Sequence, residues 1–242
     1  ANAIATVVST GVLKPHQAVA WAAFFNFIAL FIFQLKVAGT VGKGIIDPGV
    51  VDHYLIFGAL LGAIAWNIVT WYYGIPSSSS HALIGGIVGA AIAKAGTDPL
   101  IGSGIMKTVA FIVISPLFGY VLGSLILVAV AWICRNKTQR RVDKWFRRLQ
   151  LVSAALYSLG HGGNDAQKTV GIIWMLLIAA GVTGTNDPVP NWVVVLCYMA
   201  IGLGTLFGGW RIVKTMGQRI TKLKPVGGFC AETGGAMTLF LA

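Results

Sequence analysis

One polar stretch, residues 158–171, interrupts apolar sequence and carries the side chains with the richest chemistry in the chain. Its flanks, residues 149–159 and 170–182, contain no charged side chain. An ionisable residue inside a bilayer costs at least ~2.5 kcal/mol on insertion scales and marks a functional site by default. Glycines beside such residues loosen a helix, which is tolerated at membrane depth only next to protein or a cavity. The stretch therefore predicts a broken transmembrane helix whose break binds something charged.

The polar side chains of this stretch suit the binding of ions. Asn164 and Asp165 offer hard oxygen ligands for Na⁺, and Asp165 is alternatively a proton carrier. Lys168 follows three residues later and shares a helix face with Asp165 if the helix continues there. It can then pair with Asp165 or meet the charge of a bound anion, and Gln167 is a weaker candidate of the same kind. His161 is interpreted as a hydrogen-bonded packing residue.

A second polar break lies inside residues 54–93, a run of 40 residues without Asp, Glu, Lys or Arg. The break, residues 74–81, reads Gly-Ile-Pro-Ser-Ser-Ser-Ser-His and predicts two helical arms joined at a tip. The arms form either a full hairpin or a re-entrant one. Pro76 suits the first turn of a helix, and the free N–H groups of such a turn attract an anion. The alternative is a hydrophilic turn in an external loop.

The composition indicates a polytopic membrane protein. The chain has 242 residues, of which 56% are hydrophobic and 10% charged, and its mean hydropathy is +0.79. Soluble domains average about 25% charged residues. The net charge of +11 comes from basic residues between apolar spans, where they set orientation rather than bind nucleic acid. Cys134, Cys197 and Cys230 lack metal-ligand spacing and are interpreted as small apolar residues.

The pattern of apolar runs predicts a series of spans joined by short loops. Two basic segments, residues 135–148 and 211–224, are predicted to be cytoplasmic loops. Counting crossings between them makes residues 1–13 and 149–182 cross the membrane in opposite directions. The predicted apolar spans are residues 18–35, the pair within 54–93, 108–134, 149–182, 192–210 and the run that begins at 229.

Residues 1–8 and 164–171 share a rhythm of small side chains, and their opposite polarity is typical of inverted-topology repeats. We therefore expect a first repeat over residues 1–134, a basic cytoplasmic loop over 135–148, and the start of a second repeat over 149–242. The chain begins without Met and stops within an apolar run, so we expect a fragment truncated at both ends.

Several of these motifs resemble one family, the inorganic phosphate transporters, which include bacterial low-affinity phosphate permeases and sodium–phosphate symporters. Residues 160–168, Gly-His-Gly-Gly-Asn-Asp-Ala-Gln-Lys, are similar to its GxNDxxx signature. Residues 76–81, followed by Gly85-Gly86, are similar to its hairpin tip. The first residues of the chain resemble the tail of the other copy of the signature, and residues 232–235 resemble the start of a second hairpin.

The resemblance implies an all-α, inverted-repeat secondary transporter with broken helices and hairpins, which is not an enzyme and needs no cofactor. Such a protein imports inorganic phosphate by symport with H⁺ or Na⁺, and some members are thought to carry a metal–phosphate complex. It lies in the lipid bilayer of the plasma membrane, the inner membrane in bacteria, does not bind nucleic acid, and is a candidate homodimer.

The resemblance and the chemistry above together assign residues to two roles. The candidates for phosphate binding are Ser77, Ser78, Ser79, Ser80, Gln167, Lys168 and Thr233. The candidates for the coupling cation or proton are Asn2, Asn164, Asp165 and Glu232, with Na⁺ placed at Asn2, Asn164 and Asp165.

Other functions remain as alternatives. The nearest is the transport of sulfate or another oxyanion on the same fold. More remote are a passive anion channel and an intramembrane hydrolase that would use Ser79 or Ser80 with a histidine. Charged groups as sparse and as mixed in sign as Asp165 and Lys168 favour a coupled binding site over a conduction path.

Overall fold

The computed structural model describes residues 2–32, 44–184, 186–220 and 222–241. This part of the chain is built from helices, and its only strand-like feature is an isolated bridge between Ile46 and Leu100. The α-helices are α1 (Asn2–Ser9), α2 (Pro15–Ile28), α4 (His53–Tyr73), α5 (Ser79–Ala95), α6 (Gly102–Cys134), α7 (Gln139–Ala179), α8 (Asn191–Leu206), α9 (Trp210–Lys214) and α10 (Pro225–Leu241). Short helical turns η1 (Ala29–Phe31), η2 (Pro48–Val50) and η3 (Thr215–Ile220) link some of them.

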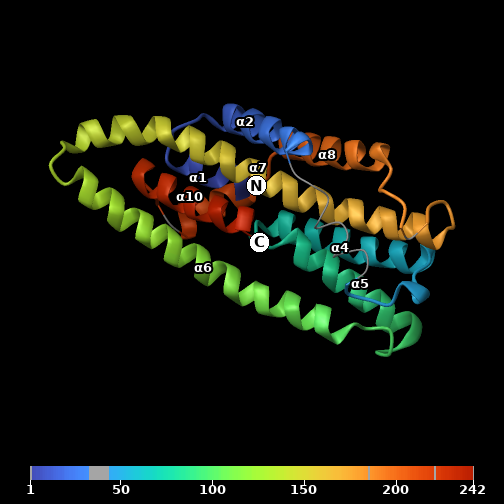
Figure 1. Ribbon diagram of the computed structural model, residues 1–242. Helices are drawn as coiled ribbons and strands as arrows, with labels where there is room; N and C mark the ends of the chain where they lie inside the picture. The colour runs from blue at the N-terminus through green and yellow to red at the C-terminus, as the bar shows by residue number, and fades with distance from the viewer. Residues whose placement is uncertain (1, 33–43, 185, 221, 242) are drawn as a thin grey trace.

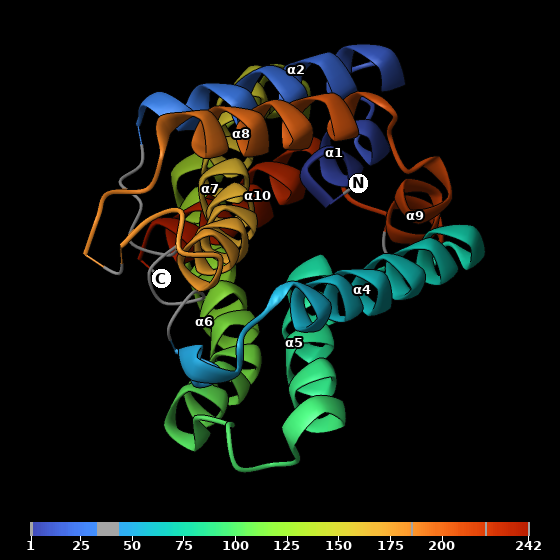
Figure 2. The ribbon, with the colours of Figure 1, turned by 90° about the vertical axis from the view of Figure 1, so that its right-hand side faces the viewer.

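Helix α7 is the axis of the molecule and contacts α1, α2, α4, α8 and α10 (Figures 1 and 2). Helices α2 and α8 lie side by side along one flank of α7, and α10 fits between α7 and α6. Helix α1 runs back along the first half of α7. The position of the candidate site is therefore set mainly by the helices that contact α7.

The predicted break at residues 74–81 is confirmed. Helix α4 ends at Gly74, which adopts the left-handed conformation with φ of 69°, and α5 begins after Ser78. The Ser78 hydroxyl caps α5 by accepting a hydrogen bond from the backbone N–H of His81 at 3.3 Å. The tip reaches the middle of α7, where Ser80 lies beside Asp165. The tip of the hairpin therefore lies beside Asp165 of α7, and whether the hairpin is full or re-entrant stays open.

The predicted break within residues 158–171 is wrong, because α7 is one continuous helix of 41 residues. Its glycines serve close packing instead. A Cβ on Gly162 would lie 2.6 Å from the Asn26 backbone of α2, and one on Gly160 would lie 3.0 Å from Leu239 of α10. Glycine has no side chain and therefore lets neighbouring helices approach closely in a membrane protein. These glycines bring α2 and α10 close to α7, while α7 itself stays continuous.

Two predicted loops are partly helical. Residues 139–148 of the predicted loop 135–148 form the first turns of α7, because Phe146 is buried at 5% exposure and packs against Phe229 of α10 at 5.2 Å between ring centroids. Residues 211–220 of the predicted loop 211–224 belong to α9 and η3.

The predicted span 192–210 is not a single straight helix. Helices α8 and α9 are bent by 60° relative to each other at a break that contains Gly208, whose φ is 74°. The bend brings Arg211 to the end of α4, where its guanidinium donates a hydrogen bond to the Tyr72 carbonyl and lies 4.9 Å from the Tyr72 ring. That contact ties α9 to the hairpin.

The surface of the molecule is strongly apolar. Helices α4 and α6 are long and apolar enough to cross a membrane, and the bent pair of α8 and α9 adds a third candidate among the described residues. None of the residues of α6 is buried, although this helix carries large side chains such as Tyr120, Leu125 and Ile133. Apolar side chains outside and polar side chains beside α7 are the arrangement that a bilayer requires.

Candidate functional site

Four polar side chains meet where the tip of the α4–α5 hairpin contacts α7, and we call them the central cluster: Ser80, His161, Asp165 and Lys168. The Lys168 ammonium donates to the Ser80 hydroxyl at 2.6 Å and lies 2.9 Å from Asp165 Oδ1. The Ser80 hydroxyl is 3.4 Å from the same carboxylate oxygen. His161 Nδ1 is 3.3 Å from the other oxygen, Oδ2. Each carboxylate oxygen of Asp165 thus has a protein partner.

The continuity of α7 creates this cluster. Residues spaced by three and four positions lie on one face of a helix, so His161, Asp165 and Lys168 point together only because α7 does not break between them. Ser80 comes from the first turn of α5, whose free N–H groups point toward the same region. The three charged or ionisable side chains are 21–26% exposed, which leaves them partly accessible. An accessible charged cluster at the middle of an apolar molecule is suited to binding ions.

Only Ser80 of the four predicted tip serines joins the cluster. The Ser77 hydroxyl donates to Thr70 Oγ1 within the hairpin at 3.1 Å, and Ser78 is engaged as the cap of α5. Ser79 is exposed, and within the described part of the chain its side chain makes no hydrogen bond to the charged residues of the cluster. The start of α5 nevertheless keeps all four residues within one turn of the cluster.

The remaining predicted phosphate ligands lie elsewhere. Gln167 is buried at 1% exposure and turns toward Tyr198 of α8. Thr233 has a buried hydroxyl that makes no hydrogen bond to the described part of the chain. Neither side chain is brought to the central cluster, so their predicted role stays a prediction.

The predicted cation ligands are also dispersed. The Asn164 amide donates to the Leu239 carbonyl of α10 at 3.0 Å and thereby fastens α10 to α7. Asn2 is the first residue of α1, and its side chain lies outside the described residues. Among the described residues, no group of three or more His, Cys, Asp or Glu is arranged to hold a metal ion. Asp165 is engaged by Lys168, and the Na⁺ site predicted at Asn2, Asn164 and Asp165 stays a prediction.

Glu232 belongs to a second polar group, which we call the enclosed cluster: Thr10, Gln150, Ser153 and Glu232. Ser153 donates to Glu232 Oε2 at 2.6 Å, and Gln150 Nε2 is 3.4 Å from Oε1. Thr10 donates to Gln150 Oε1 at 3.0 Å, which links α1 to α7. All four residues are buried, with Glu232 at 4% exposure and Gln150 at 0%.

The two clusters lie at different depths. Ser153 and Asp165 are 12 residues apart on one continuous helix, which corresponds to about 18 Å along its axis. The partners of Glu232 were not identified from the sequence. The available signal was Gln150 and Ser153, two polar residues three positions apart in an otherwise apolar run.

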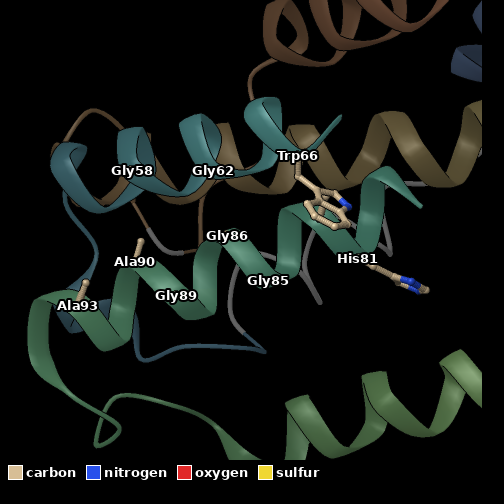
Figure 3. Close-up of a pocket in the computed structure, with 10 residues that line it drawn as sticks. Gly58, Gly62, Trp66, His81, Gly85, Gly86, Gly89, Ala90 and Ala93 are labelled. Atoms are coloured by element: carbon tan, nitrogen blue, oxygen red, sulfur yellow. The ribbon is translucent and has the colours of Figure 1, made fainter. Parts of the chain in front are cut away.

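A groove of about 680 Å³ lies between α4 and α5, and its lining includes His81, the residue after Ser80 (Figure 3). Figure 3 shows the Trp66 ring pointing toward α5, and His81 extending away from α4. The other lining residues are glycines and alanines, including Gly58, Gly62 and Gly89. A lining without charged groups does not suit phosphate, so the central cluster remains the candidate site.

Comparison with known proteins agrees with this site. The PHO4 phosphate transporter family matches residues 1–242. The "Probable low-affinity inorganic phosphate transporter" of Rhizobium meliloti is 62% identical over 242 residues, covering 100% of this chain and 72% of that protein. The protein of the same name from Bacillus subtilis is 48% identical over 242 residues, covering 99% of this chain and 72% of the relative.

A solved structure of a sodium-dependent phosphate transporter has the same fold. It superposes with a TM-score of 0.86 at 22% identity and covers 100% of this chain and 78% of that chain. The all-α fold of a secondary transporter, with a hairpin and bent helices, is therefore confirmed, and the chain is an integral membrane protein. The relatives are named as transporters, which confirms a transport function rather than an enzymatic one. On its full length, this chain belongs to the phosphate transporter family.

Proposed function

We propose that this chain is part of a secondary active transporter that imports inorganic phosphate by symport with H⁺ or Na⁺. The observation that carries the proposal is the central cluster. It combines a cationic and an anionic side chain in contact, at the middle of a membrane-embedded helix and beside the free N–H groups of a second helix. The names of the family and of the relatives supply phosphate as the substrate.

The anion would bind on the side of the cluster formed by α5. Phosphate oxygens need several hydrogen bonds to replace water, and the Ser80 hydroxyl, the Lys168 ammonium and the first N–H groups of α5 are donors in one place. Ser77, Ser78 and Ser79 border this position, and Gln167 and Thr233 are proposed as further ligands.

The coupling ion would act on the carboxylates. Asp165 shares its oxygens between Lys168, Ser80 and His161, so a proton or cation there changes the charge that faces phosphate. Asn2 and Asn164 are proposed companions, and Glu232 of the enclosed cluster is a second coupling candidate. An alternative substrate is a complex of phosphate with a metal ion.

The proposed orientation of the protein in the membrane rests on the distribution of its basic residues. Residues 135–148 and 211–224 face the cytoplasm of a cell whose plasma membrane, the inner membrane in bacteria, contains the protein. Helix α1 runs opposite to α7, which supports inverted repeats over 1–134 and 149–242 (Figure 1). A homodimer stays a prediction.

The test is uptake of radiolabelled phosphate by the full-length protein reconstituted in liposomes. We expect phosphate to accumulate above its external concentration when a proton or Na⁺ gradient is imposed, and unlabelled phosphate to compete better than sulfate. Uptake that only equilibrates under every gradient would contradict symport. Stronger competition by sulfate would indicate that sulfate, and not phosphate, is the preferred substrate.

A further inference from the structure

We propose that the ammonium of Lys168 occupies the place of a Na⁺ ion between Ser80 and Asp165, and that removing this ammonium converts the same oxygens into a Na⁺ site. The inference rests on the proposed function, because it specifies which cation the central cluster admits. It assigns to Lys168 a role in cation specificity in addition to any contact with phosphate.

The geometry is that of a cation held by oxygens. Lys168 Nζ is 2.6 Å from the Ser80 hydroxyl oxygen and 2.9 Å from Asp165 Oδ1, and these two oxygens are 3.4 Å apart. The three atoms form a compact triangle with the positive charge at one corner. A carboxylate and a hydroxyl are the hard oxygen donors that an alkali cation would use in the same position.

The ammonium excludes a second cation from this pair of oxygens. A Na⁺ ion bound to Asp165 Oδ1 would lie within a few ångströms of Lys168 Nζ, and like charges at that distance repel strongly in a site that is mostly shielded from water. The other oxygen, Oδ2, already faces His161 Nδ1 at 3.3 Å. Neither oxygen is therefore open to Na⁺ while Lys168 stays in place.

The unbroken helix keeps the ammonium there. Lys168 is three residues from Asp165 on the same face of α7, so its charge is held beside the carboxylate. Unlike a free ion, this ammonium does not dissociate from the protein. The Glu232 carboxylate is bound to Ser153 and Gln150 in the enclosed cluster instead. Asp165 is the carboxylate with which Lys168 pairs in the described part of the chain.

The experiment measures equilibrium binding of ²²Na⁺ to the purified full-length protein in detergent at constant ionic strength. Wild type is compared with Lys168→Met, which removes the charge at similar length, and with Lys168→Arg, which keeps a positive charge. A double variant, Asp165→Asn with Lys168→Met, removes the oxygen donor as well. Size-exclusion chromatography and helical circular dichroism establish that each variant is folded.

We expect Lys168→Met to bind one Na⁺ more per chain than wild type, and the double variant to lose that ion. Lys168→Arg should match wild type. A folded Lys168→Met protein without the additional ion would overturn the inference, and so would additional Na⁺ that persists in the double variant.

Transport gives a second measurement that does not depend on the folding of Lys168→Met. Replacing Na⁺ by choline should leave the Asp165-dependent part of wild-type phosphate uptake unchanged. Where Lys168→Met still transports, Na⁺ should stimulate it roughly fivefold or more, a usual size for coupling between two sites. Wild-type uptake that Na⁺ stimulates as strongly as it stimulates Lys168→Met would contradict the inference. Absence of phosphate uptake in both media would instead refute the proposed function and leave the ²²Na⁺ result standing.

Discussion

The two polar clusters beside α7 handle a carboxylate in opposite ways. In the central cluster, Asp165 is paired with the full positive charge of Lys168 and stays 21% exposed. In the enclosed cluster, Glu232 is 4% exposed, and its hydrogen-bond partners among the described residues are the neutral donors Ser153 and Gln150. A buried charge is costly unless it is paired, so the two environments favour different behaviour. The central cluster is suited to exchanging the charged groups that pair with Asp165. The enclosed cluster instead holds the Glu232 carboxyl group in a buried position.

The largest expected effect comes from unpairing the central cluster. Asp165→Asn leaves Lys168 without its counter-charge and removes the carboxylate proposed to take the coupling ion, so concentrative phosphate uptake should fall by roughly 100-fold or more, equivalent to ~2.7 kcal/mol or more. The matched control is Asp143→Asn, because Asp143 pairs with Arg147 at 3.0 Å on the exposed first turns of the same helix. Uptake near the wild-type level in Asp165→Asn would remove this residue from the mechanism.

A smaller loss is expected from the enclosed cluster. Glu232→Gln keeps the shape of the side chain but removes its charge, so concentrative uptake should fall by about tenfold, corresponding to ~1.4 kcal/mol. Glu232→Ala should also lower stability by ~1–3 kcal/mol, because Ser153 and Gln150 lose their acceptor. Thermal unfolding in detergent separates the two variants. If Glu232→Gln transports normally while Glu232→Ala is destabilised, the enclosed cluster is structural only.

The glycines between the clusters can be tested through stability. Gly162→Ala would place a Cβ 2.6 Å from the Asn26 backbone, and overpacking of this kind typically costs ~1–3 kcal/mol. Gly89→Ala on α5 is the control, because no atom lies within 4 Å of its added Cβ and alanine favours a helix by ~0.5–1 kcal/mol. Opposite shifts of the unfolding temperature are expected. A neutral Gly162→Ala would contradict the close approach of α2 to α7.

The smallest effect concerns the base of the hairpin that supplies Ser80. Asp52 caps α4 by accepting from Leu55 N at 2.8 Å and pairs with Lys94 at 2.8 Å. The hydrogen bond from Lys94 and the cap lower the pKa of Asp52. Its contribution to stability is therefore complete above the ordinary Asp pKa of about 3.9 and is lost as the pH falls through the lowered value.

Variants at this position separate the cap from the charge. Asp52→Ala should lower the unfolding temperature by removal of the cap, whereas Asp52→Asn keeps a capping oxygen and should lower it less. Unfolding measured at several pH values checks both variants. An Asp52→Asn protein as unstable as Asp52→Ala would show that the ion pair with Lys94, not the cap, matters here.

Local signals in the sequence predicted local structure well. The structure confirms the hairpin break predicted at residues 74–81, but Pro76 lies before Ser78, the N-cap of α5, and not in the first turn of the helix as expected. The prediction of a break in α7 was wrong because it treated glycine only as a residue that weakens a helix. In the structure, Gly162 instead allows contact with Asn26, which is far away in the sequence. The bend before α9 was missed for a related reason, since its partner Tyr72 lies on α4.

The sites show the same limit. The spacing of Asp165 and Lys168 predicted that they would share a face if the helix continued, and they do. The contact of Ser80 with both residues depends on the tip of a hairpin about 85 positions earlier in the chain. Glu232 was identified as an unusual intramembrane acid, but its partners Gln150 and Ser153 lie on α7, about 80 positions earlier in the chain. Contacts between distant segments cannot be read from periodicity or capping.

The central claim is that phosphate binds at the central cluster and not at the enclosed one. It is tested most directly by a crystal structure of the full-length protein with arsenate, a phosphate analogue whose arsenic atom is located by anomalous scattering. The account predicts an arsenic peak within hydrogen-bonding reach of Ser80 and Lys168, at the start of α5, and loss of that peak in Ser80→Ala with Lys168→Met. A peak beside Glu232 and Ser153, or one that persists in the double variant, would contradict it.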